Sequence, residues 1–74
     1  MSTERKRSLT IAGHRTSVSL EDPFWDGLKE IAATQGATVP GLIAEIDSRR
    51  AGMNLSSALR LHVLAHYRQR AEGH

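Results

Sequence analysis

The stretch Arg15-Thr16-Ser17-Val18-Ser19-Leu20 alternates between polar and apolar side chains and leads directly into Glu21-Asp22-Pro23-Phe24-Trp25. Because successive side chains of a strand point to opposite faces, Val18 and Leu20 share one face and the polar side chains share the other. One short strand leaves its backbone groups unpaired, and a lone hairpin is only marginally stable in water. We therefore predict that a second copy of the chain supplies the partner strand and that the two copies form an antiparallel ribbon.

The size and composition of the chain favour a small intracellular oligomer. The chain has 74 residues and no cysteine, which excludes a disulfide and a Cys-based zinc site. A single core of this size supplies only about 3–5 kcal/mol, so we expect a homodimer. No apolar run approaches the ~20 residues of a membrane span, and no signal-peptide core is seen. The expected location is the cytoplasm, without membrane contact.

The charge of the chain is small but unevenly distributed. The net charge is only +2. Residues 1–20 carry four cations against one carboxylate, residues 21–47 carry one lysine against six carboxylates, and residues 48–74 carry five arginines against one glutamate. Basic charge gathered in two segments predicts contact with a polyanion. A solvated surface with no partner is the alternative.

Residues 22–35 form the clearest predicted helix. Asp22 is the expected N-cap, Pro23 occupies the first helical position, and Gly36 ends the helix in a left-handed conformation. Apolar side chains then recur at helical spacing. Trp25 falls beside this stripe and is expected to be half-buried.

Two more helices are expected, over residues 38–50 and 55–70, followed by a tail at 71–74. Thr38 is the predicted N-cap of the second helix, and Asn54 or Ser56 caps the third. The third helix is apolar over a wide arc, so we expect it to pack on the second helix and across the dimer. The predicted dimer core consists of Val18, Leu20, Phe24, Leu28, Ile31, Leu42, Ile43 and Ile46.

The segment before the ribbon strand has two interpretations. Residues 1–7 are charged and without periodicity, which predicts a flexible basic arm. Residues 8–11 alternate and are followed by Ala12-Gly13, so residues 8–13 either fold back on the strand or form an extended lead-in. A fold-back hairpin predicts four strands in the dimer.

The order of basic arm, ribbon strand, helix, short turn and helix resembles the ribbon-helix-helix family of DNA-binding proteins, the group of the Arc and MetJ repressors. The resemblance covers about residues 14–50 and is carried by the strand 15–20, the stripe that begins at Phe24, and the Gly36-Ala37-Thr38 turn. With Asn54-Leu55-Ser56-Ser57-Ala58-Leu59-Arg60, it looks like one bacterial subgroup of that family, with an additional C-terminal helix. The implied fold is mainly α with a short β-ribbon, in an intertwined homodimer.

The resemblance also implies which residues contact DNA. By position, Arg15, Ser17 and Ser19 are the outward ribbon residues that face base edges, and Thr38 and Val39 at the start of the second helix anchor a phosphate. Arginine prefers guanine, whereas serine reads bases ambiguously, so two serines weaken the expected sequence specificity. Solvent-facing strand residues and a plain N-cap are the alternatives.

The basic arm supplies further candidates for phosphate contact. Arg5, Lys6 and Arg7 are expected to follow the phosphate backbone or to enter the minor groove, unless the arm is only a solubilising tail. His14, which lies beside Arg15, is another candidate.

Nothing in the sequence predicts catalysis, a cofactor or a metal. His62 and His66 are four residues apart, which is a metal-ligand spacing on a helix. Residue 63 is valine rather than the glutamate of a zinc protease, and no third ligand is nearby, so surface or interface histidines are favoured. The carboxylates line helix surfaces rather than a predicted pocket.

These observations predict a transcriptional regulator, with repression as the favoured mode of action, that binds double-stranded DNA through the ribbon. The first alternative is an antitoxin with the same DNA-binding half, whose residues 54–70 hold a toxin. The second is a protein-interaction or dimerisation module that does not bind DNA. The low net charge and the ribbon serines are compatible with this second alternative.

Overall fold

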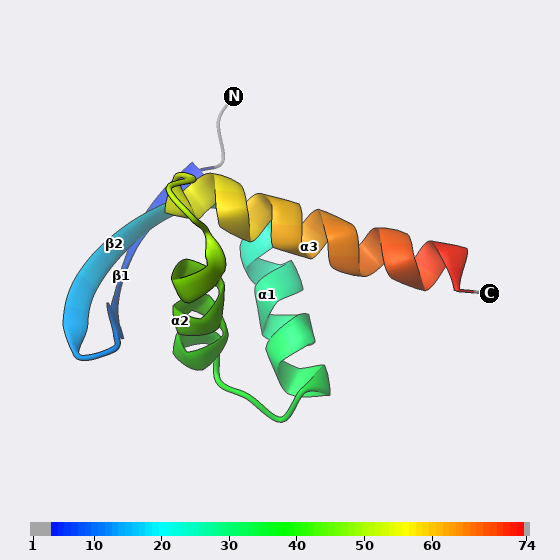
Figure 1. Cartoon of the computed structure of the whole chain (residues 1–74), viewed down its shortest axis with the longest axis horizontal. Coiled ribbons are helices and arrows are strands. Elements are labelled where there is room, and N and C mark those ends of the chain that lie inside the picture. The colour runs from blue at the N-terminus through cyan, green and yellow to red at the C-terminus, as the bar shows by residue number, and fades with distance from the viewer. Residues whose placement is uncertain (1–3, 74) are drawn as a thin grey trace.

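The structure, a computed structural model, describes residues 4–73 and consists of a β-hairpin followed by three helices (Figure 1). Residues 1–3 of the predicted arm and His74 of the predicted tail lie outside the described residues. The elements are β1 (Glu4–Ile11), β2 (His14–Glu21), α1 (Asp22–Thr34), α2 (Val39–Arg49) and α3 (Leu55–Glu72). The predicted fold class, mainly helical with a short β-ribbon and an extra C-terminal helix, is confirmed.

The two strands pair with each other within one chain. They are antiparallel, with Ile11 opposite His14 at the turn. The two turn residues, Ala12 and Gly13, have φ values of 51° and 82°, and positive φ at both positions is what a tight type I′ hairpin loop requires. The prediction that a second copy supplies the partner strand is therefore wrong for this pairing. The fold-back interpretation of residues 8–13 is correct.

The first strand also includes residues 4–7, which were expected to be a flexible arm. Directly opposite residues of an antiparallel pair share a face, and Arg7 lies opposite the buried Val18. The Arg7 guanidinium lies 4.5 Å from the centre of the Trp25 ring and donates to the Asp22 Oδ1 at 3.0 Å. This charged segment is a strand because the start of α1 supplies partners for its inward side chains.

An N-cap at Asp22 would make Pro23 the first helical residue, but helix α1 begins one residue earlier, at Asp22. Glu21 is the N-cap and makes no side-chain cap hydrogen bond, whereas Asp22 is the first helical residue. The predicted capping role of Asp22 is wrong because its carboxylate pairs with Arg7 instead. A carboxylate in the first turn still interacts favourably with the helix dipole. The helix ends at Thr34 with Gln35 as its C-cap, and Gly36 follows in the predicted left-handed conformation with a φ of +66°.

The other two helices are capped by the expected side chains. The Thr38 hydroxyl accepts a hydrogen bond of 3.1 Å from the Gly41 N–H. The Asn54 side chain accepts one of 3.3 Å from the Ser57 N–H. Both predicted caps are confirmed, and each satisfies a backbone donor that the helix itself leaves unpaired.

The hydrophobic core lies between the inner face of the hairpin and the helices. Every predicted core residue is buried except Phe24, which is half-buried against the core. The buried apolar residues are Ile11, Val18, Leu20, Leu28, Ile31, Ala32, Leu42, Ile43, Ile46, Ala58, Leu59 and Val63. The residues predicted to be buried between two copies are therefore buried within one chain. Strand β1 and helix α3 of the same chain cover the surfaces for which we expected a second copy.

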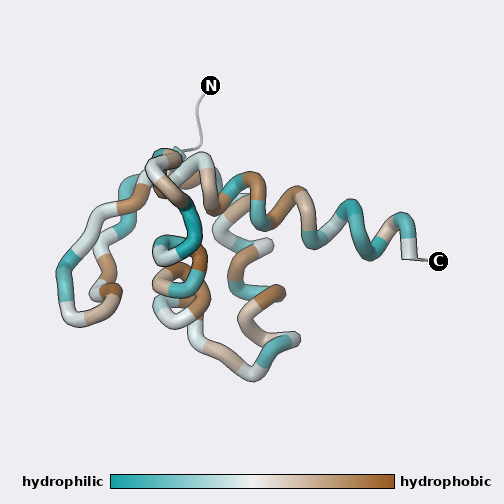
Figure 2. Tube along the Cα trace, viewed as in Figure 1, coloured by the Kyte–Doolittle hydropathy of each residue, from teal (hydrophilic) through white to brown (hydrophobic). Residues whose placement is uncertain are grey.

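Helix α3 covers the other elements mainly with its first half, and Tyr67 in its second half is also partly buried against the core. It packs on α1, α2 and β2, and its C-terminal half extends away from the rest of the fold (Figure 1). Figure 2 shows hydrophobic segments within α1 and α2, and a largely hydrophilic end of α3. Leu61 and Leu64 remain 52% and 50% exposed. Within residues 4–73, no helix combines the length and apolar character needed to cross a bilayer.

Candidate nucleic-acid interface

Six polar side chains lie beyond Glu4 and Glu21 on the face of the hairpin that points away from the core. Lys6, Ser8 and Thr10 come from β1, and Ser19, Ser17 and Arg15 lie opposite them on β2. We call these six residues the polar face. All are exposed except Ser19, which is half-buried.

The polar face includes the three residues predicted to face DNA bases and three more. Arg15, Ser17 and Ser19 lie where the alternation of β2 predicts them. Ser8 and Thr10 were missed as site residues, although the alternation of residues 8–11 is visible in the sequence. The alternation of residues 8–11 identifies site residues only once β1 is known to pair with β2. The sequence alone did not decide this pairing.

The chemistry of the polar face suits the edges of base pairs. An arginine can donate two hydrogen bonds to guanine, and serine and threonine hydroxyls both donate and accept. A major groove about 12 Å wide admits a two-stranded ribbon. The hairpin therefore presents, within one chain, a ribbon of suitable width with a row of short polar side chains and a cation near each end.

Three of the predicted phosphate contacts, Arg5, Arg7 and His14, lie on the other face of the hairpin. Arg5 and Arg7 both pair with the Asp22 Oδ1, at 3.4 and 3.0 Å. The Arg7 side chain is only 29% exposed and also stacks on Trp25, so its phosphate role conflicts with its position. Arg5 remains largely exposed, and its phosphate role stays a prediction. His14 is exposed beside the turn, opposite Ile11.

An arginine from α3 binds two carboxylates at the base of the hairpin. The Arg60 Nε donates to the Glu21 Oε1 at 2.9 Å, and its Nη2 donates to the Glu4 Oε2 at 2.9 Å. The hydrogen bond from Arg60 lowers the pKa of Glu21, and the same contact raises the pKa of Arg60. Sequence reasoning missed this cluster because its members are distant along the chain.

The N-terminus of α2 offers few backbone donors to an anion. Pro40 has no N–H, and the N–H groups of Gly41 and Leu42 are taken by the side chain and carbonyl of Thr38. Within residues 38–42, this leaves the N–H groups of Thr38 and Val39 for an external acceptor, supported by the helix dipole. Figure 1 shows the loop before α2 and the turn of the hairpin at the same end of the fold.

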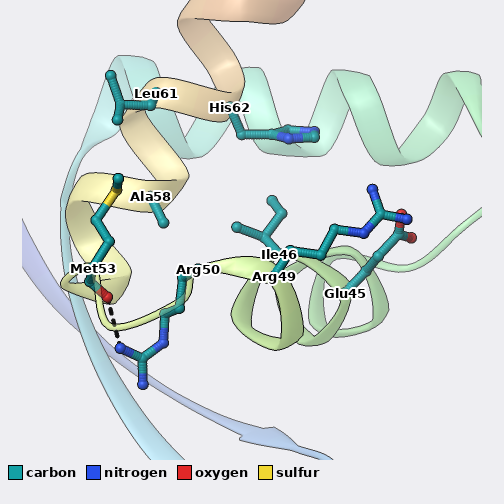
Figure 3. A pocket seen from close by; sticks show the side chains of 8 residues that line it. All are labelled: Glu45, Ile46, Arg49, Arg50, Met53, Ala58, Leu61 and His62. Atoms are coloured by element: carbon teal, nitrogen blue, oxygen red, sulfur yellow. Dashed lines mark hydrogen bonds and ion pairs between the residues drawn. The ribbon is translucent and has the colours of Figure 1, made fainter.

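A pocket lies between the end of α2 and the beginning of α3 (Figure 3). It is lined by Glu45, Ile46, Arg49, Arg50, Met53, Ala58, Leu61 and His62. Its arginines have internal partners: Arg49 pairs with Glu45 at 3.2 Å, and Arg50 donates to the Met53 carbonyl at 2.7 Å. The pocket therefore offers an apolar floor rather than unpaired cations for phosphate.

The histidines of α3 do not form a metal site with other side chains. His62 lines the pocket, where burial lowers its pKa although the nearby Glu45 acts in the opposite direction. His66 makes an edge-on contact with the Tyr67 ring at 5.1 Å between centroids. In residues 4–73, no three His, Asp or Glu side chains are grouped so that they could hold a metal ion.

A family model described as a ribbon-helix-helix domain matches residues 4–67. The match covers the hairpin, α1, α2 and most of α3. No curated protein and no solved structure matches the chain.

Proposed function

The chain belongs to the ribbon-helix-helix domain family, and from this premise we propose that it is a transcriptional regulator, with repression as its mode of action in the cytoplasm. Domains of this family are generally DNA-binding transcriptional regulators or antitoxins. The proposed activity is binding of double-stranded DNA, with the hairpin inserted in the major groove.

The observation that carries this proposal is the pairing of β1 with β2. It gathers six side chains with hydrogen-bonding groups on one face of a two-stranded ribbon, while the apolar side chains of both strands lie on the other. Arg15 is the residue best suited to discriminate a base, because a bidentate contact to guanine is worth about 1–3 kcal/mol. The hydroxyls of Ser17 and Ser19 add contacts of lower selectivity.

Phosphate contacts are proposed at the margins of the ribbon. Lys6 lies on the polar face, and the Val39 N–H lies at the N-terminus of α2, capped by Thr38. Arg5 and His14 are also exposed, on the opposite face of the hairpin. Contacts of this kind fix the orientation of the protein on the duplex, whereas base contacts supply specificity.

We also propose that two chains act together, since ribbon-helix-helix domains typically dimerise and bind DNA. Strands in a sheet are about 4.8 Å apart, so four strands side by side span roughly 14 Å between the outer backbones. That width exceeds the groove of about 12 Å even before side chains are added. We therefore expect each chain to insert its own hairpin, and the dimer to read two segments of DNA.

The first test is DNA binding by the purified protein. A duplex obtained by random-site selection is titrated with wild type and Arg15→Ala at several salt concentrations, with fluorescence anisotropy as the readout. We expect the affinity of Arg15→Ala to fall about tenfold to a hundredfold with an unchanged melting temperature. Affinity should also decrease steeply with salt.

The matched control is Lys29→Ala, which removes an exposed cation of α1 that pairs with Asp26 at 3.6 Å. It should bind DNA as wild type does. Equal affinity of Arg15→Ala and wild type would contradict insertion of the polar face. No binding by wild type at low salt would instead favour a protein-interaction module.

A second candidate function, that of an antitoxin, is favoured by the surface of α3. Met53, Leu61 and Leu64 are large apolar side chains exposed to solvent, and exposed apolar clusters often mark protein contacts. If the chain is an antitoxin, residues 54–70 bind a toxin while the hairpin binds DNA. Leu61→Glu should then abolish co-purification with a co-expressed toxin from a neighbouring reading frame and leave DNA binding intact.

A further inference from the structure

The carboxylates of Glu4 and Glu21 lie at the base of the polar face. They are directly opposite each other, and the next pair on the same face is Lys6 and Ser19. Two residues along a strand correspond to roughly 6.6 Å, which is shorter than the Debye length of about 8 Å at physiological ionic strength. Charge on the two glutamates therefore acts on any phosphate that approaches the polar face.

The guanidinium of Arg60 is placed to offset this charge. It spans both strands with hydrogen bonds of 2.9 Å to each carboxylate, and its Nη2 makes a third contact of 3.4 Å to the Glu21 Oε2. Like charges directly opposite in a sheet are unfavourable, so a shared cation also relieves their mutual repulsion. The Arg60 side chain is 29% exposed, which limits screening of the contacts by water.

We propose, on the basis of the proposed DNA-binding function, that Arg60 is a positioning residue for DNA binding. It offsets one of the two negative charges of Glu4 and Glu21, which weakens their repulsion of phosphates that approach the polar face. In this role Arg60 acts through the two carboxylates and does not contact DNA itself. It also makes the C-terminal helix, through its first half, a determinant of DNA affinity.

The test compares Arg60→Met with variants in which the carboxylates are removed. Arg60→Met removes one positive charge from beside Glu4 and Glu21, and a unit charge at about 7 Å in water changes affinity about threefold. We expect Arg60→Met to bind a selected duplex about threefold more weakly than wild type. The triple variant Glu4→Gln/Glu21→Gln/Arg60→Met should bind at least as tightly as wild type. A purely structural role, or direct contact with DNA, predicts that the triple variant stays as weak as Arg60→Met and would overturn the proposal.

A second variant keeps the proposal testable if Arg60→Met fails to fold. Glu4→Gln/Glu21→Gln retains Arg60 and should bind DNA several-fold more tightly than wild type. Unchanged or weaker binding by this variant overturns the proposal. Arg68→Met, which removes an exposed arginine farther along the same helix, is the charge-matched control and should bind as wild type does. If wild type binds no duplex, the proposed DNA-binding function itself is refuted. If wild type binds and Arg60→Met binds equally well, only the role of Arg60 is refuted.

Discussion

Both faces of the hairpin carry cations and use them for different purposes. Lys6 and Arg7 are neighbours on β1, and both are cations. Arg7 points inward, where it pairs with Asp22 and covers the ring of Trp25, whereas Lys6 is exposed on the polar face. The alternation of the strand therefore decides whether a cation stabilises the fold or remains available to a ligand. Composition and net charge alone do not separate these roles.

The largest effect that tests this difference is expected on the inner face. Leu20 is fully buried, and Leu20→Ala should lower the free energy of unfolding by about 2–5 kcal/mol. Ser17→Ala, on the same strand but on the polar face, should change it by less than about 0.5 kcal/mol. Urea denaturation followed by the fluorescence of Trp25 measures both. Equal destabilisation by the two substitutions would show that the faces are not distinct.

An intermediate effect is expected from the neighbouring cations. Arg7→Met removes a cation–π contact and a partly exposed ion pair, which together contribute about 1 kcal/mol to stability. The Arg7 Nε is buried without a hydrogen-bond partner, so its removal offsets part of that loss. DNA affinity per folded molecule should not change.

Lys6→Met is the matched substitution on the polar face. It should leave the unfolding curve unchanged and weaken DNA binding, and the slope of log K against log salt should decrease in magnitude by about 0.9 if Lys6 contacts one phosphate. Urea denaturation and a salt titration of DNA binding separate the two variants. If Lys6→Met is the destabilised protein and Arg7→Met the weak binder, the assignment of the two faces is reversed.

The sequence predicts β2 well because its pattern is local. Val18 and Leu20 alternate with polar residues, so the buried face and the outward position of Arg15 follow from two-residue periodicity alone. The helices begin and end within two residues of the expected bounds for the same reason: Thr38, Asn54 and Gly36 act within their own turns. Local chemistry is what a single sequence displays most directly.

The first strand was harder to predict because its evidence is not local. Residues 4–7 are all charged, and their alternation appears only when Arg7 is set against Val18 and Trp25. The turn also lacks the usual signature, because Ala12 takes a positive φ where asparagine or aspartate is common. The Arg60 cluster joins segments 39 and 56 residues apart, so it requires the tertiary fold.

The smallest expected effect is on the pH dependence of stability and concerns Glu21. Glu21 lies at the base of the polar face and accepts a hydrogen bond from Arg60. Its pKa is lowered, first by the hydrogen bond from Arg60 and then by a backbone hydrogen bond. A carboxylate with a lower pKa in the folded state stabilises the protein above its unfolded pKa of about 4.3, and this contribution is lost as the pH falls through the folded value. Glu21→Gln should therefore lower the melting temperature slightly at pH 7 and flatten its decrease between about pH 5 and pH 3.

The control variant for this pH effect is Glu72→Gln. Glu72 is exposed near the end of α3 and its carboxylate lies 4.0 Å from the Arg68 guanidinium, which is too far for a hydrogen bond. Thermal melts of both variants and wild type over the same pH range give the difference directly, since the other carboxylates contribute equally to each curve. Glu72→Gln should follow the acid dependence of wild type. If Glu21→Gln also shows the acid dependence of wild type, the hydrogen bond from Arg60 does not stabilise the folded protein, and Glu21 behaves like an ordinary exposed carboxylate.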